Sequence, residues 1–578
     1  MSKNNKQSVP SLSFEGFRGV DGTACGEDPP RASDVVNFRI RKDGSLEKRC
    51  GYRLLTSVDE TIRAMWTGME RGSFLGYLLL GNTLYSLDFS TGDRRALGTV
   101  DTSEGKACIF FYSGYLYVMD KTGFYRFQNG TLSRPLGYVP LIGKDWPNNT
   151  IGETYEPRNI LNPHARISYL ISDPPSIFLC VEDEIQSVQA VYVNGILQSL
   201  DNYTVDADFN TVNVSGLNAG DRVVVYLTLK TDYSDLLSAL YSSPEVILFG
   251  DANNNRLFFW GGSEGNTIFC SSFVRNDQLK ESRKHFPESD GLYFPEEFEF
   301  QVGSGQCNVM GAVRHYDRLL LFTEGETWMA SSDASGLEEF PAVCVNSELG
   351  CGPQGGVILA GNDPISIGRS GIWQWSGDTE ELNHRNARCI SREIEDRLSR
   401  EDYFCATLFY DRAEDAIWLN CPSSGDVWVY TLSEKNWTRF SRIDADRFLE
   451  IDGAVGFLRG TGFYVFDPAY TSDYYTETDI REIRGEYEST VSDFGDGRIK
   501  NASYALLRGD LDGGNVEIRV QGNNIPAASC VFSEPNGNRH SILSKRLPTG
   551  RFRHATVHLT APGAQRQIIH SLSLHCRP

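Results

Sequence analysis

Short apolar runs separated by polar turns repeat along most of the chain. In the clearest unit, Ala416–Phe440, an apolar run, a Pro-Ser-Ser-Gly turn, an aromatic run and a closing aromatic segment follow one another. Aromatic and β-branched runs punctuated by Gly, Pro, Ser and Asn are typical of antiparallel strands joined by tight turns. The pattern therefore predicts short antiparallel strands joined by tight turns at this point of the chain.

Looser copies of this unit occur on both sides of it. They cover residues 76–98, 107–130, 256–273, 317–331, 357–375 and 448–467. A single small sheet cannot bury both of its faces, so repeated units of this kind pack against each other as the blades of a β-propeller. We expect about six to eight blades. We also expect the ring to close through strands distant in sequence, with the hairpin Phe38–Leu46 near the last unit, Phe448–Asp467.

Two stretches depart from the blade pattern. Short strands at close spacing after residue 156 predict a small β-sandwich inserted between two blades, and the last 90 or so residues suffice for a second one. The fold class is thus all-β, a β-propeller with an inserted and a C-terminal β-sandwich. The expected organisation is an N-terminal arm (1–32), a first propeller segment (33–155), the inserted domain (156–232), a second propeller segment (233–470), a linker (471–485) and the C-terminal sandwich (486–578).

The net charge is not typical of a protein that binds nucleic acid tightly. The 578 residues carry a formal net charge of −21, and no basic stripe of the kind that binds phosphates is visible. The 13 cysteines include no CxxC pair, which favours reduced, buried thiols over a zinc site. No apolar run approaches the length of about 18 residues that a membrane-spanning helix needs.

Catalytic and metal-binding patterns are absent from the sequence. There is no GxSxG, HExxH or Walker motif. Asp206, Asp208 and Asn210 have the opening spacing of a calcium loop, but the Gly and Glu that complete such a loop are missing. His570 and His575 fall on opposite faces of an alternating strand. We therefore expect no enzymatic activity, no cofactor and no metal.

The segment 37–52, NFRIRKDGSLEKRCGY, resembles the start of a known family. The matching residues are Asn37, Phe38, Asp43, Gly44, Leu46, Lys48, Arg49, Gly51 and Tyr52. They resemble phage tail nozzle proteins, also called tail tubular protein B or packaged-DNA stabilisation proteins of short-tailed phages, and Pro364–Trp375 is similar to the same group. The resemblance covers roughly residues 20–150 and 245–470, and departs at Cys50, where the family often has Pro. The insert resembles the immunoglobulin-like modules common in phage tail proteins.

This resemblance implies a structural virion protein of a phage tail. It would form a homo-oligomeric ring, a hexamer in that family, which continues the DNA channel below the portal and adaptor, retains packaged DNA and passes it during ejection. The implied partners are further copies of the chain, the portal or adaptor, tail fibres or a tail tip, and double-stranded DNA without sequence-specific binding. The implied location is the virion tail after synthesis in the host cytoplasm, and the polar start of the chain suits such synthesis.

Two other interpretations stay open. One is a propeller that binds host-surface glycan, or a degenerate glycosidase, in which aromatic residues and carboxylates converge on a propeller mouth. The other is a tail-tip or connector protein of a longer-tailed phage. A closed ring would favour the nozzle over the first of these.

An acidic segment, Glu281–Gln301, is the candidate for a channel wall. DNA carries one negative charge per ~1.7 Å of its axis, so a basic wall would hold it and an acidic wall would leave it free. Screening limits this repulsion to a Debye length of about 8 Å. The expected channel-lining residues are Glu288, Asp290, Glu296, Glu297 and Glu299.

Overall fold

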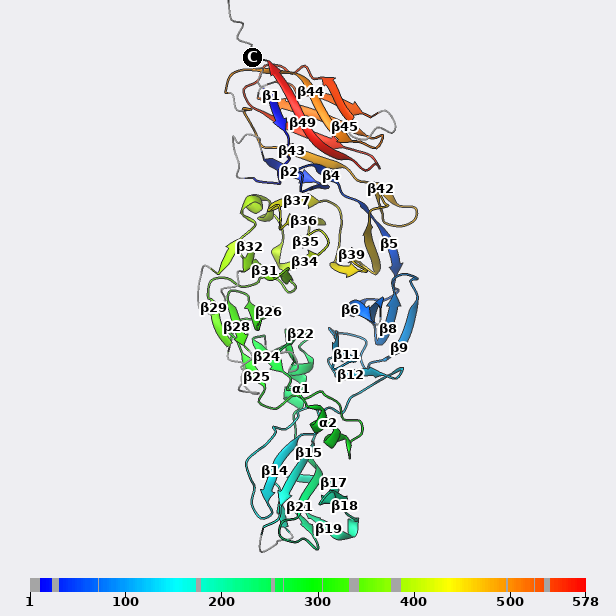
Figure 1. Ribbon diagram of the computed structural model, residues 1–578, viewed down its shortest axis with the longest axis vertical. Helices are drawn as coiled ribbons and strands as arrows, with labels where there is room; N and C mark the ends of the chain where they lie inside the picture. The colour runs from blue at the N-terminus through cyan, green and yellow to red at the C-terminus, as the bar shows by residue number, and fades with distance from the viewer. Residues whose placement is uncertain are drawn as a thin grey trace, which may run out of the picture.

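The chain folds into three β-rich regions arranged along one line. The computed structural model describes residues 11–22, 31–70, 72–172, 178–250, 255–263, 265–303, 305–331, 342–375, 386–494, 497–523, 525–534 and 541–577. A propeller occupies the centre, with a small sandwich at one end and a larger sandwich containing the C-terminal strands at the other (Figure 1). The fold is all-β, as the strand pattern predicts.

Within the described residues, seven four-stranded antiparallel blades form the propeller. The first blade contains β6 (Ile62–Glu70), β7 (Ser73–Leu80), β8 (Thr83–Asp88) and β9 (Arg94–Thr99), and the second contains β10 (Cys108–Tyr112), β11 (Tyr115–Asp120), β12 (Gly123–Gln128) and β13 (Thr131–Ser133). The third contains β22 (Glu245–Phe249), β23 (Arg256–Trp260), β24 (Thr267–Cys270) and β25 (Glu299–Gln301), the fourth contains β26 (Val309–His315), β27 (Arg318–Thr323), β28 (Thr327–Ser331) and β29 (Ala342–Asn346), and the fifth contains β30 (Val357–Ala360), β31 (Asp363–Gly368), β32 (Gly371–Trp375) and β33 (Ala387–Cys389). The sixth contains β34 (Thr407–Asp411), β35 (Ala416–Cys421), β36 (Asp426–Thr431) and β37 (Asn436–Phe440), and the seventh contains β38 (Arg447–Ile451), β39 (Ala454–Arg459) and β40 (Gly462–Asp467) with β5 (Gly51–Ser57). The innermost strands, which are the first of each blade, contact one another in a closed ring.

Packing between blades explains the apolar runs of the sequence. A middle strand such as β35 is buried along its whole length, because a neighbouring blade covers each face of its sheet. Trp418 of β35 packs edge-on against Phe440 in its own blade and Phe448 in the next, with ring centroids 5.4 and 5.2 Å apart. A strand buried on both faces reads as a continuous apolar run, and this is the pattern from which the blades were predicted.

The ring closes through a strand from the N-terminal region of the chain. β5 pairs with β40 as the outermost strand of the seventh blade, with Tyr52 opposite Phe466. The hairpin expected at this position, β3 (Phe38–Ile40) with β4 (Leu46–Lys48), pairs instead with the C-terminal sandwich. Closure therefore uses the strand that directly follows the predicted hairpin.

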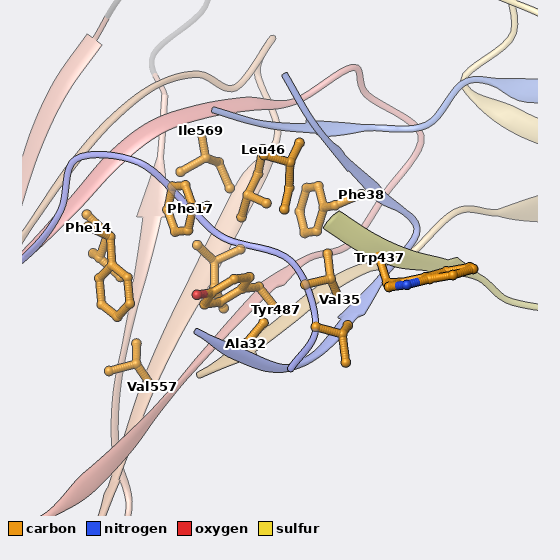
Figure 2. Packing of buried hydrophobic residues seen from close by; sticks show 14 of the residues in the cluster. Phe14, Phe17, Ala32, Val35, Phe38, Leu46, Trp437, Tyr487, Val557 and Ile569 are labelled. Atoms are coloured by element: carbon orange, nitrogen blue, oxygen red, sulfur yellow. The ribbon is translucent and has the colours of Figure 1, made fainter. Parts of the chain in front are cut away.

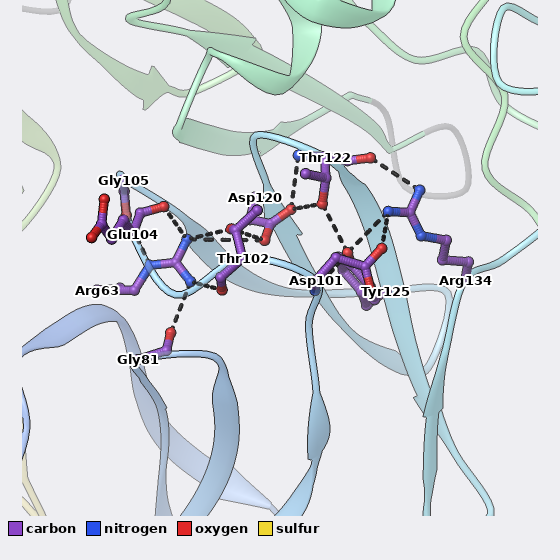
Figure 3. A network of polar contacts seen from close by, with 10 residues as sticks. All are labelled: Arg63, Gly81, Asp101, Thr102, Glu104, Gly105, Asp120, Thr122, Tyr125 and Arg134. Carbon is purple, nitrogen blue, oxygen red and sulfur yellow. Dashed lines mark hydrogen bonds and ion pairs between the residues drawn. The ribbon is translucent and has the colours of Figure 1, made fainter.

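A network of polar contacts joins the first two blades (Figure 3). Arg63 of β6 donates to the backbone carbonyls of Gly81 (2.8 Å) and Thr102 (2.6 Å). Asp120, which is fully buried, accepts from the hydroxyls of Thr102 (2.7 Å) and Thr122 (2.6 Å). Since buried carbonyls and carboxylates need such partners, the network fixes the turns of two adjacent blades.

The inserted sandwich lies between the second and third blades. One sheet contains β14 (Leu141–Pro147), β15 (His164–Leu170), β21 (Arg222–Leu229), β17 (Ile185–Val193) and β18 (Ile196–Leu197), and the other contains β16 (Phe178–Cys180), β20 (Thr211–Val214) and β19 (Tyr203–Asp206). The short helices η1 (Leu200–Asn202) and α1 (Ser234–Tyr241) follow β18 and β21. The first and last strands lie on either side of β15, so the two ends of the insert are close together. Because β14 belongs to this sheet, the insert begins near Leu141 rather than at residue 156 as expected.

The C-terminal sandwich contains strands from both ends of the chain. One sheet has the order β3, β4, β49 (Ile568–Arg577), β44 (Asn501–Asp510) and β47 (Ser541–Arg546), with β1 (Ser11–Phe14) also paired to β49. The other has the order β2 (Ala32–Val36), β43 (Gly485–Ser489), β48 (Ala555–Ala561), β45 (Asn515–Gly522) and β46 (Ala528–Ser533), and continues through a parallel β2–β37 pair into the sixth blade. The expected free arm (1–32) and the first residues of the expected first propeller segment (33–155) thus belong partly to this sandwich, because they complete its sheets.

The core of this sandwich shows why the N-terminal strands are needed (Figure 2). Phe14 and Phe17 stack with ring centroids 5.7 Å apart, and both lie edge-on to Tyr487 of β43. All three side chains are buried. Without the N-terminal segment, Tyr487 and the apolar side chains of β48 and β49 would face water, which costs about 25 cal/mol per Å² of apolar surface.

The expected linker, residues 471–485, is also structured. β41 (Ser472–Tyr474) and β42 (Ile480–Glu482) form a two-stranded hairpin beside β5. Asp473 of this hairpin is buried in an ion pair with Arg49. The charged and Tyr-rich composition suggested a linker, but side chains of this segment make contacts at the joint between the propeller and the sandwich.

Candidate functional site

The acidic segment Glu281–Gln301 lies at the joint between the propeller and the inserted sandwich. It runs from the end of α2 (Asn276–Arg283) to β25, and so connects the two outer strands of the third blade. Its middle is buried: the backbone N–H groups of Tyr138 and Ile160 donate to the carbonyls of Leu292 (2.8 Å) and Phe294 (2.9 Å). The segment is thus packed into the joint and hydrogen-bonded to neighbouring segments, unlike a solvent-exposed loop.

Asp290 does not face solvent, and its prediction as a channel-lining residue is wrong. Its side chain is fully buried and accepts from the Tyr117 hydroxyl (3.0 Å) and the Arg126 guanidinium (3.1 Å) of the second blade. It also accepts from the backbone N–H of Leu292 (3.0 Å). Burial raises the pKa of Asp290, while Leu292, Arg126 and Tyr117 act in the opposite direction. A carboxylate enclosed in this way holds the segment against the second blade.

The other four predicted carboxylates lie on the surface. Glu288, Glu296, Glu297 and Glu299 are exposed. Glu296 accepts from the hydroxyl of Tyr233 (3.3 Å), and Glu299 lies on β25, the outermost strand of its blade. They are therefore near the outer rim of the propeller and away from its own axis. A channel that they line would have to be formed between copies of the chain.

Asp290→Asn is expected to lower the free energy of unfolding by about 1–3 kcal/mol, because the amide leaves the buried Arg126 without its counter-charge. Glu297→Gln is the matched control and should change stability by less than about 0.5 kcal/mol, since this side chain is exposed. Urea unfolding of the full chain measures both. Equal midpoints for the two variants would contradict the structural role of Asp290.

Two histidines lie on the sandwich side of the same joint. His164 of β15 stacks on Phe286, with ring centroids 4.5 Å apart, and its ring nitrogen Nδ1 is 3.0 Å from the Thr228 hydroxyl. His285 lies beside Tyr226, with centroids 5.5 Å apart. Burial lowers the pKa of His164, and the neighbouring His285 lowers it further. Burial also lowers the pKa of His285. Both rings are therefore neutral when the joint is closed at neutral pH.

Mild acid is expected to weaken this joint. The folded-state pKa of each histidine lies below its ordinary value of 6.5, so the unfolded chain takes up these protons more readily. The contribution of the neutral rings to stability is complete above that value and is lost as pH falls through the lowered folded pKa values. The urea midpoint should fall between about pH 7.5 and about pH 5.5, and this fall should be larger in the native chain than in the variant His164→Gln/His285→Gln. An equal fall in both proteins would show that other groups dominate.

The family-like segment 37–52 lies at the opposite end of the propeller, where the C-terminal sandwich joins it. Asn37 adopts a left-handed backbone conformation (φ 54°) between β2 and β3. Its amide nitrogen donates to the Ser441 hydroxyl (3.0 Å) and the Arg484 carbonyl (2.9 Å). Its amide oxygen accepts from Nε of Arg49 (3.0 Å) and the backbone N–H of Ser441 (3.1 Å). One side chain therefore connects the hairpin to the sixth blade and to the 471–485 segment.

Arg49 and Lys48 extend this joint on both sides. Arg49 donates through both terminal nitrogens to Asp473 (2.8 and 2.7 Å), and both side chains are buried. Lys48 donates to the Gly563 carbonyl (2.7 Å) and the Gln567 side chain (3.2 Å) of the sandwich. Burial lowers the pKa of Lys48 to about 8. Lys48 thus contacts the C-terminal sandwich, whereas Arg49 contacts the hairpin within residues 471–485.

A cleft of about 550 Å³ opens at this joint. Its charged lining includes Arg39, Arg41, Lys42, Glu47, Glu414, Glu434 and Arg566. Arg39 is 3.5 Å from Glu414, Arg41 is 3.6 Å from Glu47, and Arg566 also pairs with Glu47. Three of the arginines in the cleft therefore already have a carboxylate partner, and Arg41 and Arg566 share Glu47. Sequence reasoning identified the segment by resemblance but not its position, because its partners are distant in sequence.

The portion of the chain that the structure describes contains no three His, Cys, Asp or Glu side chains grouped to hold a metal ion. None of its helices is long and apolar enough to span a membrane.

No protein-family model and no curated protein matches the chain. Among solved structures, it is similar to a chain of a mitotic checkpoint complex (10% identity, TM-score 0.36, 77% of this chain and 98% of that chain covered). It is also similar to a putative 6-phosphogluconolactonase from Bacteroides fragilis (11% identity, TM-score 0.25, 68% and 94% covered). A third is an exo-β-1,3-galactanase from Phanerochaete chrysosporium (9% identity, TM-score 0.23, 91% and 100% covered). Similarities at such low TM-scores give no indication of what the protein binds or does.

Proposed function

We propose that the protein is a structural subunit of a phage tail, the nozzle of a short-tailed phage, which assembles with copies of itself into a closed ring around the DNA path. The ring retains packaged DNA and lets it pass during ejection. The chain contributes surfaces and rigidity to this assembly rather than catalysis. Its partners are the portal or adaptor on one side and tail fibres or a tail tip on the other.

One observation carries this proposal. The residues of the nozzle-like segment are those that close the propeller and fasten it to the sandwich: Tyr52 lies in the closing strand, and Asn37 and Arg49 hold the joint. The segment therefore serves the architecture that the resemblance implies, a propeller with additional β-domains. Gly51 fits the same interpretation, because a Cβ atom there would lie 1.9 Å from the carbonyl oxygen of Ser472.

The overall arrangement and charge suit such a subunit. The two sandwiches project from opposite ends of the propeller (Figure 1), so one subunit offers separate surfaces to neighbours on different sides. The net charge of −21 and the exposed Glu288, Glu296, Glu297 and Glu299 are compatible with a wall that repels DNA. In this proposal those four carboxylates line the channel formed between subunits.

Mass photometry of the purified full chain tests the ring. We expect a species of about six subunits of 64.6 kDa each, in line with closed cyclic symmetry. Electron microscopy of that species should show a central channel wide enough for duplex DNA, with the four exposed carboxylates on its wall. A chain that stays monomeric at all concentrations and binds glycans on an array would contradict the nozzle and favour the glycan-binding alternative. A ring whose channel lies far from these carboxylates would keep the nozzle but remove this segment from its wall.

A further inference from the structure

The outer end of the inserted sandwich exposes an apolar surface that nothing in the described chain covers. Five large apolar side chains in one continuous segment are solvent-exposed there: Ile196, Leu197, Leu200, Val205 and Phe209. Leu200 and Phe209 keep 77% and 78% of their surface in contact with water. Single exposed apolar residues are ordinary, but a group of them within one segment is typical of an interaction site.

The segment also carries two sheet edges. β18 ends one sheet of the sandwich and β19 ends the other, and only η1 separates them in sequence. Figure 1 shows β18 and β19 at the end of the insert that points away from the propeller. Edge strands in soluble proteins are usually protected by Lys, Pro or a bulge. Neither β18 nor β19 contains Lys or Pro, and the β19–β20 pairing is regular.

The charge around this surface indicates the kind of partner. From Ile167 to Asp221 the sequence contains no Lys, Arg or His. The acidic residues nearer the propeller are paired, since Arg158 contacts Glu182 and Asp183 and Lys230 contacts Glu184. Asp201, Asp206 and Asp208, which lie among the exposed apolar residues, have no cation nearby in the sequence to pair with. The exposed apolar residues are therefore accompanied by carboxylates, and Arg222, the cation beside the β17–β18 turn, is paired with Asp145 (3.2 Å).

We propose that this end of the insert, defined by Ile196, Leu197, Leu200, Val205 and Phe209, binds an extended segment of a partner protein in which apolar residues alternate with Lys or Arg. The apolar side chains supply the buried area, and the three aspartates supply complementary charge. The open edge of β19 can add the segment as a further strand. A second copy of the same surface is disfavoured, because it would place like charges opposite each other.

Two synthetic peptides test the proposal with the full chain. Both have Val and Phe at alternate positions, and the positions between are Lys in one and Glu in the other. Fluorescence anisotropy should detect binding of the Lys peptide at least about tenfold tighter than the Glu peptide. The variant Leu200→Ser/Phe209→Ser should weaken binding of the Lys peptide by about tenfold or more, and so should Asp201→Asn/Asp206→Asn/Asp208→Asn.

The control separates this surface from general attraction to an acidic protein. Met69→Ser/Phe404→Ser removes two exposed apolar side chains from the propeller and should leave the affinity unchanged. The substituted residues are exposed except for Asp206, which is half-buried, and thermal unfolding verifies that all variants fold. No binding of the Lys peptide, equal affinity for both peptides, or unchanged affinity in the Leu200/Phe209 variant would overturn the proposal. Concentration-dependent dimers that only this variant abolishes would assign the surface to a second copy and also overturn it.

Discussion

Asp473→Ala is expected to lower the free energy of unfolding by about 3–5 kcal/mol, because it leaves a buried guanidinium without its counter-charge. Arg49 and Asp473 are 1% and 8% exposed and joined by two hydrogen bonds of 2.8 and 2.7 Å. Arg49 also lies over the rings of Phe440 and Phe466, with 5.8 and 6.0 Å to the ring centroids. Water cannot replace the lost carboxylate without opening this packing. Urea unfolding followed by tryptophan fluorescence measures the loss.

An exposed ion pair of the same type is the control. Arg94 and Asp59 are 2.8 Å apart, but the Asp59 side chain is 83% exposed. Exposed pairs contribute about 0–1 kcal/mol, so Asp59→Ala should scarcely move the urea midpoint. If Asp473→Ala and Asp59→Ala had similar effects, burial of the Arg49–Asp473 pair would not matter for the joint, and its assignment as the fastening between propeller and sandwich would fail.

Tyr52→Ala is expected to destabilise the protein by about 3–5 kcal/mol, the range for removing a large buried aromatic side chain. Tyr52 is fully buried in the closing strand β5. Its ring lies edge-on to Phe457, Tyr464 and Phe466 of the seventh blade, with centroids 5.0, 5.8 and 5.7 Å apart. Loss of the ring leaves a cavity where the two ends of the propeller meet, so the ring of blades should open at this seam first.

Limited proteolysis combined with urea unfolding separates local opening from general loss of stability. In Tyr52→Ala, early cleavage should map to β5 and to the seventh blade. Tyr504→Ala, at a residue of β44 that is 45% exposed, is the matched control and should leave the cleavage pattern unchanged. Early cleavage in a blade remote from the seam would show that closure by β5 is not the weak point of the ring.

The place of the acidic segment could be predicted only to a limited extent. Its exposed carboxylates follow from composition, since a stretch rich in Glu is usually solvated. Nothing local marks Asp290 as different from Glu288 or Glu297, because its partners, Tyr117 and Arg126, come from a blade more than 160 residues earlier in the chain. The exposed apolar surface at Ile196–Phe209 could likewise not be predicted from the sequence, since alternating apolar residues in a strand normally indicate a buried face.

The local structure of this protein follows from its amino-acid sequence. Apolar runs and turn residues specify short antiparallel strands, and the blade from Ala416 to Phe440 has its strands where the pattern places them. Repetition of that unit implied a propeller, since each blade needs neighbours to cover its faces. The change of pattern near residue 156 indicated a separate β-domain, although its first strand lies earlier in the chain.

The pairing of distant strands, in contrast, depends on the packing of the whole fold. β1 to β4 join a sandwich whose other strands follow residue 484, β5 closes the ring, and the expected linker contributes a buried carboxylate. The alternation of Phe38 and Ile40 specifies a half-buried strand, but it does not specify which sheet buries it. Pairing partners of a β-strand are chosen by packing across the whole fold, because the hydrogen bonds of one strand edge are chemically alike and fit any complementary edge. For this reason the strands could be predicted from the sequence, while the joints between the domains could not.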